Sequence, residues 1–196
     1  MLKDMLLREQ IDPKKRLSVS YLAEIIGMGR APVTDAVKRL ESEDFLKIIP
    51  RQGIVVREMT VQEMRDINET RLVLETYIME RIAPAFSEED VKILRDFIDS
   101  MKKYEILNDY YNFIVSDHDM HMYLYGLCRN QYMTDILTKL RDRIFTVGFK
   151  IVARREGRMK STIQEHEAIL SALEKRDSLH ASENMRTHLT NGWRLI

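Results

Sequence analysis

The sequence predicts a mainly α-helical protein in two parts: a short N-terminal unit of helices with a β-hairpin, and a longer antiparallel all-α helical bundle. Turn-forming residues are scarce, with 7 Gly and 4 Pro in 196 residues. They are also unevenly placed, since three of the prolines and three of the glycines fall within residues 1–57. Beyond residue 60 the apolar residues recur with the period of a helix. We therefore predict two domains, residues 1–58 and residues 59–196.

The composition is that of an ordinary globular protein, with 44% hydrophobic and 32% charged residues. Lys+Arg and Asp+Glu are both 31, but residues 1–57 hold 11 basic against 8 acidic side chains, which suits a polyanionic partner. The single cysteine, Cys128, excludes an internal disulfide framework and is typical of a reducing compartment. No signal peptide is recognised at the start, and no apolar run approaches the roughly 18 residues of a membrane span. We expect a soluble, cytoplasmic protein without a membrane partner.

Short apolar runs separated by turn residues define the N-terminal elements. Ser20 can cap the second helix, and Gly27-Met28-Gly29 makes a tight turn into the third, whose first turn tolerates Pro32. Two β-rich runs separated by Pro50-Arg51-Gln52-Gly53 indicate a hairpin. Helices are predicted over Leu2–Gln10, Tyr21–Ile26 and Val33–Ser42, and strands over Phe45–Ile49 and Ile54–Val56. This order is the layout of a winged helix-turn-helix.

In that layout the third helix is held by the other two, so that its exposed face can enter the major groove of DNA. That face carries Arg30, Thr34 and Lys38, while Arg51 and Gln52 lie at the tip of the hairpin. We predict that these five residues bind DNA. The alternative is a small helical subdomain without DNA contact, because glycine turns join many helix pairs.

Six helices and no strands are predicted for the rest of the chain, which favours an antiparallel bundle. Pro84 ends the first of them, and Ser87-Glu88-Glu89-Asp90 places a cap and acidic residues at the start of the second. The predicted helices cover residues 61–83, 91–106, 108–128, 132–154, 158–175 and 178–193.

All five histidines lie in this bundle, and three of its helices each direct a histidine or an aspartate toward an apolar face. Asp117 and His121 share one face because they are four residues apart, and His166 and His188 lie on the apolar faces of the last two helices. Three imidazoles and one carboxylate suit a divalent transition metal, with positions left for water or a bound anion. We expect zinc, with nickel or manganese as alternatives.

The remaining two histidines are predicted to be non-ligands. His118 lies about 100° around its helix from Asp117, and His180 sits near a helix start. Any one histidine of the set, taken alone, is also explained as a hydrogen-bonded core residue. The prediction of a metal site depends on the convergence of four groups from three helices.

The N-terminal third resembles the signature of GntR-superfamily transcriptional regulators. The residues that carry the resemblance are Leu17-Ser18-Val19-Ser20-Tyr21-Leu22-Ala23-Glu24-Ile25-Ile26-Gly27-Met28-Gly29-Arg30-Ala31-Pro32-Val33, with Leu40-Glu41 and Pro50–Val56 matching the helix end and the wing. The resemblance implies binding to double-stranded operator DNA, with Arg30 in direct contact. Thr34 stands where the family has a second arginine, and Gly29 replaces a serine, so an altered operator or weaker binding is expected.

The C-terminal part resembles the FCD effector domain of FadR-type GntR regulators. The resemblance is carried by Asp117-His118-Asp119-Met120-His121, by Glu165–Leu173, and by the segment from Asp177 through Met185 to His188-Leu189. It implies that Asp117, His121, His166 and His188 are the metal ligands. It also implies a homodimer that binds a small carboxylate or sugar acid beside the metal.

Four residues are predicted to bind that effector. Arg71 and Asn130 fall on family positions, although either is also explained as a helix-pairing or capping residue. Arg141 and Arg143 are further candidates, because an arginine can clamp a carboxylate bidentately.

Two other functions stay open at the level of the sequence. One is a regulator in which the metal is structural or is itself the sensed signal. The more remote one is a metal-dependent hydrolytic enzyme in which Glu165 or Glu167 activates water. Against an enzyme, the chain has no H-E-x-x-H, no E-x-x-H pair, no P-loop and no G-x-S-x-G.

Overall fold

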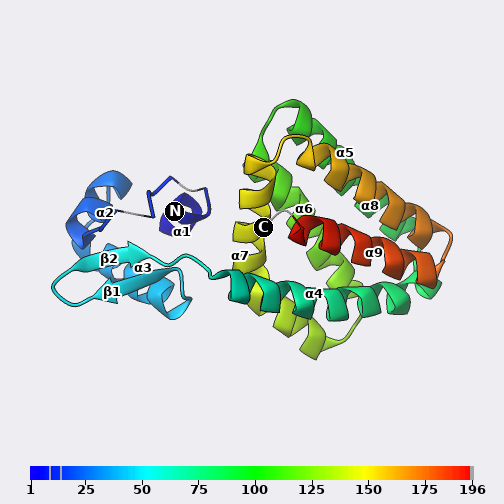
Figure 1. The fold of residues 1–196 in the computed structure, drawn as a ribbon, viewed down its shortest axis with the longest axis horizontal. Coiled ribbons are helices and arrows are strands. Elements are labelled where there is room, and N and C mark those ends of the chain that lie inside the picture. The colour runs from blue at the N-terminus through cyan, green and yellow to red at the C-terminus, as the bar shows by residue number, and fades with distance from the viewer. Residues whose placement is uncertain (9, 14, 195–196) are drawn as a thin grey trace. The chain divides into compact units, whose positions relative to one another are not determined.

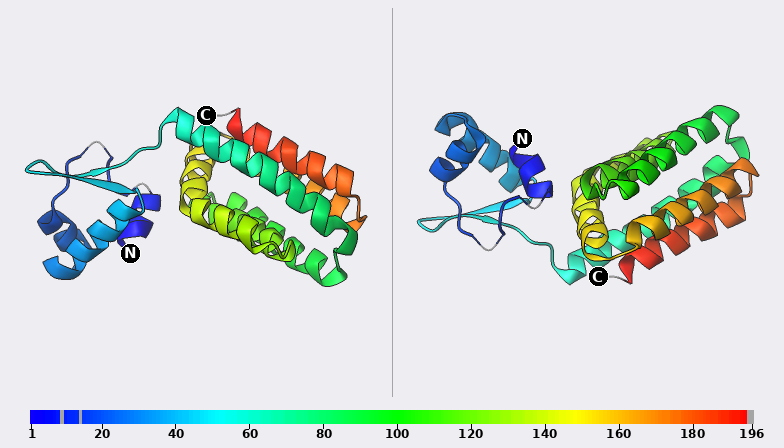
Figure 2. Two further views of the ribbon diagram at one scale, coloured as in Figure 1. Left: turned by 90° about the horizontal axis from the view of Figure 1, so that it is seen from below. Right: turned by 90° about the horizontal axis from the view of Figure 1, so that it is seen from above.

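The computed structural model describes residues 1–8, 10–13 and 15–194, and it confirms the predicted fold class (Figures 1 and 2). The chain divides into two compact units, Met1–Thr60 and Val61–Ile196. No helix in the described ranges is both long enough and apolar enough to cross a membrane.

The N-terminal unit contains three helices and a two-stranded antiparallel sheet. Its core is formed by one face of each helix together with inward residues of the strands, including Leu22, Val33, Val37, Leu46 and Ile54. The elements are α1 (Leu2–Leu7), α2 (Val19–Ile26), α3 (Arg30–Ser42), β1 (Leu46–Ile49) and β2 (Gly53–Val56).

Three predicted helix boundaries in this unit need correction. The α3 helix begins at Arg30, three residues before the predicted Val33. The N-cap of α2 is Ser18 rather than Ser20, because the Ser18 side chain accepts a hydrogen bond from the Tyr21 amide at 3.1 Å. The α1 helix ends at Leu7, before the predicted Gln10, and Glu9 lies outside the described residues.

The hairpin wing is anchored to the segment that precedes α2. Ile49 pairs with Gly53 at the hairpin end, and Leu17 forms an isolated bridge to Ile54. Gly53 has φ +102°, and a Cβ there would lie 2.7 Å from the Leu17 carbonyl oxygen. Only glycine fits this position without displacing the backbone. Gly53 therefore allows the hairpin to lie close against the Leu17 backbone.

The C-terminal unit is the predicted bundle of six α-helices, with a short 3-10 turn at Ala83–Ala85. In it α4 packs along α9, α8 packs against both α5 and α9, and α6 packs against α5 and α7 (Figure 2). The helices are α4 (Val61–Ile82), α5 (Glu88–Ile106), α6 (Tyr110–Leu127), α7 (Gln131–Arg154), α8 (Arg158–Glu174) and α9 (Ser178–Trp193).

Local capping sets where these helices begin. Ser87 and Asp90 form a reciprocal capping box at the start of α5, as the acidic run predicted. Asp109, Asn130 and Asp177 cap α6, α7 and α9, each by accepting a hydrogen bond from the backbone N–H three residues on. The buried polar side chains that form the site described next lie within the helices rather than at their capped ends.

Candidate metal centre and nucleic-acid interface

The structure brings together the four residues predicted as metal ligands. Asp117 and His121 project from α6, His166 from α8 and His188 from α9. One ligand atom from each lies within 4.8 Å of the others. The three imidazole rings are clustered with centroids 4.6–5.4 Å apart, and His166 is fully buried.

Two carboxylates orient two of these imidazoles. The Nδ1 of His121 lies 2.7 Å from Oε2 of Glu75, and the Nδ1 of His188 lies 2.8 Å from Oε2 of Glu165. An ionised carboxylate only accepts hydrogen bonds, so the Nδ1–H of each ring is the donor, and Nε2 is the nitrogen left to bind a metal. A carboxylate behind the ring is the usual support of a metal-binding histidine.

The cluster contains buried nitrogen atoms without partners. The Nε2 of His121 and both ring nitrogens of His166 have no hydrogen-bond partner among the described residues. Leaving such an atom buried and unpaired costs about 1–3 kcal/mol. A cation bound between the four groups would use these lone pairs, so the donor set and its geometry fit a divalent metal.

The electrostatics hold the cluster in the protonation state that a metal requires. Burial lowers the pKa of His166 well below its ordinary value, the neighbouring His188 lowers it further, and Asp117 opposes both. Burial also lowers the pKa of His188, against the effect of Glu165.

Burial would raise the pKa of Asp117, but the nearby imidazoles outweigh it and the pKa is lowered. The pKa of Glu165 falls to about 2, because hydrogen bonds from His188 and Arg158 outweigh its burial. Metal ligands must be deprotonated, and His166, His188 and Asp117 already are near neutral pH.

The free energy of unfolding of the metal-free protein is expected to fall as the pH is lowered from about 7.5 to about 5.5. His166 and His188 have lowered pKa values in the folded state. Below about pH 6.5 the unfolded chain therefore binds more protons at these two histidines than the folded chain does. The loss is at most about 1.4 kcal/mol per histidine per pH unit. The lowered pKa values of Asp117 and Glu165 add to the loss only when the pH falls below about 4.5.

This pH dependence is measured by urea unfolding of chelator-treated protein at a series of pH values. The fluorescence of Trp193, the only tryptophan, reports the C-terminal unit. Replacing His166 by leucine should flatten the dependence. An unchanged slope in His166→Leu would contradict the assignment of the effect to the cluster.

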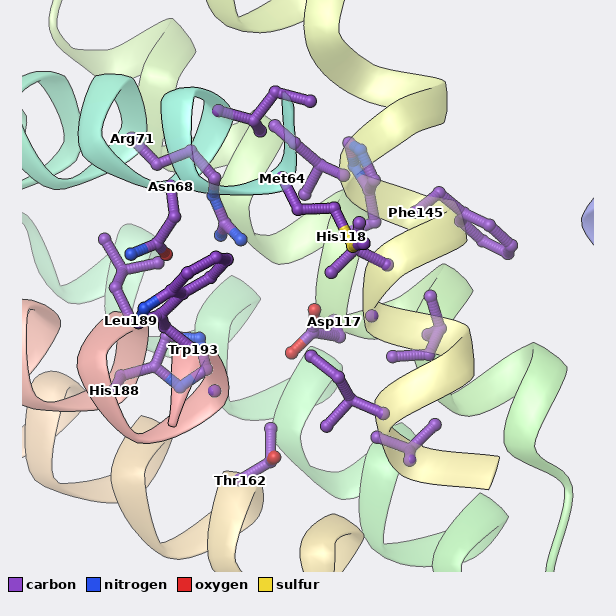
Figure 3. A pocket seen from close by; sticks show the side chains of 18 of the residues that line it. Met64, Asn68, Arg71, Asp117, His118, Phe145, Thr162, His188, Leu189 and Trp193 are labelled. Atoms are coloured by element: carbon purple, nitrogen blue, oxygen red, sulfur yellow. The ribbon is translucent and has the colours of Figure 1, made fainter. Parts of the chain in front are cut away.

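A pocket adjoins the candidate metal centre (Figure 3). Its volume is about 80 Å³. By the same measure, a cavity needs about 10–15 Å³ to hold one water molecule. Asp117 and His188 form part of its wall, and Arg71 and Arg158 line it as well. Figure 3 shows the side chains of Arg71 and Asp117 reaching into it from α4 and α6. The remaining wall is largely apolar and includes Met64, Ile114, Phe145 and Trp193.

Both pocket arginines are paired with carboxylates. Arg71 Nε donates to Oε1 of Glu75 at 2.5 Å, and its side chain is 17% exposed. Arg158 donates to the two oxygens of Glu165 at 2.8 and 2.9 Å. These pairs fix two guanidinium groups at the edge of a small cavity beside the four clustered candidate ligands. The arrangement can hold an anion next to a bound cation.

Of the four residues predicted to bind an effector, only Arg71 lines this pocket, and the other three stay predictions that this cavity does not support. Asn130 is exposed and caps α7 by accepting a hydrogen bond from the Met133 amide at 3.3 Å. The Arg141 side chain is exposed and lies 3.7 Å from Asp119. Arg143 is also absent from the wall of the pocket. Helical period alone did not show which side chains form the wall of this pocket.

The two histidines predicted as non-ligands lie outside the ligand cluster. His118 is buried, its Nε2 lies 3.1 Å from the Arg141 carbonyl oxygen, and it forms part of the pocket wall. His180 is exposed and its Nδ1 contacts Asp177.

Sequence reasoning missed the supporting residues Glu75 and Arg158. Glu75 follows Arg71 by four residues, a spacing that signals an ion pair on one helix face. Nothing in the sequence showed that the same carboxylate meets His121, which is 46 residues away. For Arg158 no comparable signal exists, because an arginine at a helix start is ordinarily exposed.

The predicted DNA-binding residues lie on the surface of the N-terminal unit. Arg30 and Lys38 are exposed on α3, whereas Val33 and Val37 of the same helix are buried. Thr34, half-buried between them, donates its hydroxyl to the Arg30 carbonyl oxygen at 2.8 Å. Arg51 and Gln52 are exposed at the hairpin tip, where Arg51 has φ +61°. These positions are compatible with a groove-binding helix and a wing that contacts the backbone of DNA.

Comparison with known proteins gives matches to both parts of the chain. Residues 1–56 match the bacterial regulatory proteins of the gntR family, and residues 66–191 match the FCD domain. These families and the curated relatives are transcriptional regulators rather than enzymes.

Similarity to individual proteins extends over most of the chain. An uncharacterized HTH-type transcriptional regulator of Bacillus subtilis, YdhC, is 24% identical over 97% of this chain and 85% of its own length. The gluconate operon transcriptional repressor of Bacillus licheniformis is 29% identical over 79% of this chain and 62% of its own length. The solved structure of Escherichia coli McbR/YncC has a TM-score of 0.79 at 21% identity, over 97% of this chain and 90% of that one.

Proposed function

Because the chain belongs to the GntR family of transcriptional regulators and carries an FCD effector-binding domain, we propose that its bundle binds a divalent metal and a small organic acid that together modulate operator binding. One observation carries the proposal: four potential ligand atoms from three helices lie within 4.8 Å of one another beside a pocket lined by Arg71. The three histidines and one aspartate favour zinc, with nickel or manganese as alternatives. When bound, the metal supplies a positive charge with open positions for an anion.

A small carboxylate or a sugar acid is the proposed effector. The pocket is small and mostly apolar, and its polar groups are concentrated near Arg71, Asp117 and His188. A guanidinium and a neighbouring cation together select a carboxylate over a neutral molecule. One relative is named for the gluconate operon, which makes D-gluconate a sensible first probe.

For operator recognition we propose that Arg30, Thr34 and Lys38 of α3 face the major groove, with Arg51 and Gln52 of the wing beside it. Winged helices of this type read two half-sites as dimers. Exposed apolar pairs one helical turn apart, Val73 with Tyr77 on α4 and Tyr132 with Ile136 on α7, support pairing with a second copy of the chain. A regulator of bacterial DNA acts in the cytoplasm, where we place this protein.

Operator binding measured with and without zinc and D-gluconate tests the proposed function. The DNA is the promoter region that flanks the gene, and the titration is repeated over a range of salt concentrations. We expect salt-dependent binding by the zinc-loaded protein, changed about 5- to 150-fold by the organic acid. If D-gluconate has no effect, a panel of small carboxylates is tested next.

Two results would lead to other conclusions. Operator affinity that responds to zinc but to no carboxylate would favour a metal sensor. Identical affinity under every condition would remove the proposed regulation altogether.

A further inference from the structure

Glu75 contacts one residue of the candidate metal centre, His121, and one residue of the pocket wall, Arg71. It lies on α4 with no exposed surface, and its two carboxylate oxygens have different partners. Oε1 accepts a hydrogen bond from Nε of Arg71 at 2.5 Å, and Oε2 accepts one from Nδ1 of His121 at 2.7 Å. One end of this chain of contacts is a proposed metal ligand, and the other is a guanidinium in the pocket wall.

A related arrangement occurs a second time in the bundle, where Oε2 of Glu165 is shared by His188 and Arg158, and Oε1 accepts from Arg158 and Asn191. Glu165 accepts hydrogen bonds from Nδ1 of His188 at 2.8 Å and from both terminal nitrogens of Arg158 at 2.8 and 2.9 Å. His188 belongs to the ligand cluster and Arg158 lines the pocket. Two separate Arg–Glu–His relays, on different helices, therefore join one cluster to one pocket.

We propose that the two relays, Arg71–Glu75–His121 and Arg158–Glu165–His188, couple metal occupancy to anion binding. The proposal rests on the function inferred above. Glu75 and Glu165 are positioning residues, because each acts through a histidine and an arginine rather than by touching metal or effector.

The direction of the coupling follows from hydrogen-bond physics. A metal on Nε2 makes the Nδ1–H of the same ring a stronger donor, so the carboxylate is drawn toward the histidine. Its hold on the arginine weakens in turn, and more of the guanidinium charge is available to an anion in the pocket. By reciprocity an anion that binds the arginine strengthens metal binding.

The coupling is tested with zinc alone, by following the Nε–H resonance of Arg71 in a proton–nitrogen spectrum of the full chain. The resonance is assigned from its loss in Arg71→Lys. In the wild type we expect its proton shift to move upfield in proportion to zinc occupancy, as the bond to Glu75 weakens. The Nε–H of Arg39, which pairs with Glu43 on the surface of the other unit, should not move.

Variants of Glu75 separate the relay from a direct effect of the ion's charge. In Glu75→Gln the Arg71 shift should no longer follow zinc, and zinc affinity should fall about 10- to 100-fold, the usual effect of losing such a partner. Glu75→Asp keeps the charge but shortens the reach, and should lose most of the response. Glu80→Gln, a change on the same helix at an exposed residue that contacts Ser182, should behave as the wild type.

The outcomes are distinguishable. Zinc saturation that leaves Arg71 unmoved in the wild type overturns the relay, whether or not the Glu75 variants fold. An equal shift in wild type and Glu75→Gln also overturns it, because the shift would then come from the field of the ion. A wild type that binds no zinc overturns the proposed metal site, and the relay with it.

Discussion

Replacing His166 by leucine is expected to lower zinc affinity by at least about 100-fold, since structural zinc sites release about 10–16 kcal/mol and four ligands share it. The same change is expected to leave the metal-free protein as stable as the wild type or to stabilise it. His166 is fully buried, and neither of its ring nitrogens has a hydrogen-bond partner among the described residues, although Nε2 lies 3.5 Å from Oδ1 of Asp117. An apolar side chain of similar size removes that penalty of about 1–3 kcal/mol.

The two effects have opposite signs and are read in one experiment. Thermal unfolding is followed with chelator and with excess zinc, and zinc affinity is measured against a chromophoric chelator. At a zinc concentration 1,000 times its dissociation constant, the wild type should gain about 4 kcal/mol, and His166→Leu should gain much less.

A matched control comes from the other buried histidine of the region. His118 lies outside the ligand cluster, so His118→Leu should retain zinc affinity within about threefold, even if it loses stability with the hydrogen bond to Arg141. Equal zinc affinity in wild type and His166→Leu would remove His166 from the ligand set. A loss in both variants would indicate that any disturbance of the core weakens the site.

Replacing Arg30 by alanine is expected to weaken operator binding about 5- to 150-fold, which corresponds to the 1–3 kcal/mol of one arginine contact to a base. Arg30 is exposed at the first position of α3, where a recognition helix approaches base edges. Affinity for unrelated DNA should fall much less. If Arg30 instead contacts a phosphate, the loss will be similar for all sequences, and the salt dependence will fall by about one ion.

Arg39 provides the control for Arg30. It is on the same helix with a highly exposed side chain, but it lies about half a turn around the axis and pairs with Glu43. Arg39→Ala should therefore leave operator affinity within about threefold. A loss as large as that of Arg30→Ala would mean that the charge of the unit, not the face of α3, determines binding.

The sequence by itself was sufficient for the fold class and for the four side chains that the bundle brings together at the candidate metal centre. Helical period is a local property, so it placed Asp117 and His121 on one face and put His166 and His188 on the apolar faces of their own helices. Capping is equally local, and Ser87 with Asp90 was found where the acidic run predicted a helix start. The glycine turn and the hairpin were predictable for the same reason, because each is determined by a few adjacent residues.

The predictions differed from the structure in two situations. In one, two nearby residues could serve as the same helix cap; in the other, the sequence did not show which local partner a polar side chain would have. Ser18 and Ser20 are both acceptable caps, and only the built helix shows that Ser18 receives the Tyr21 amide. Asn130, on a family position, proved to cap α7 away from the pocket. Arg141 was predicted to bind the effector because arginine commonly binds carboxylates, but its side chain is exposed and lies beside Asp119.

The tertiary structure alone decided how the four ligands are supported and what lies beside them. Glu75 contacts His121, and Glu165 contacts His188, in each case across two separate helices. The pocket that Arg71 and Arg158 line is likewise formed by residues of separate helices. A helix presents a face at a period set by its own backbone, whereas the partner of that face depends on how distant helices pack. The sequence therefore determined which groups point inward, and the packing of the bundle determined which of them meet.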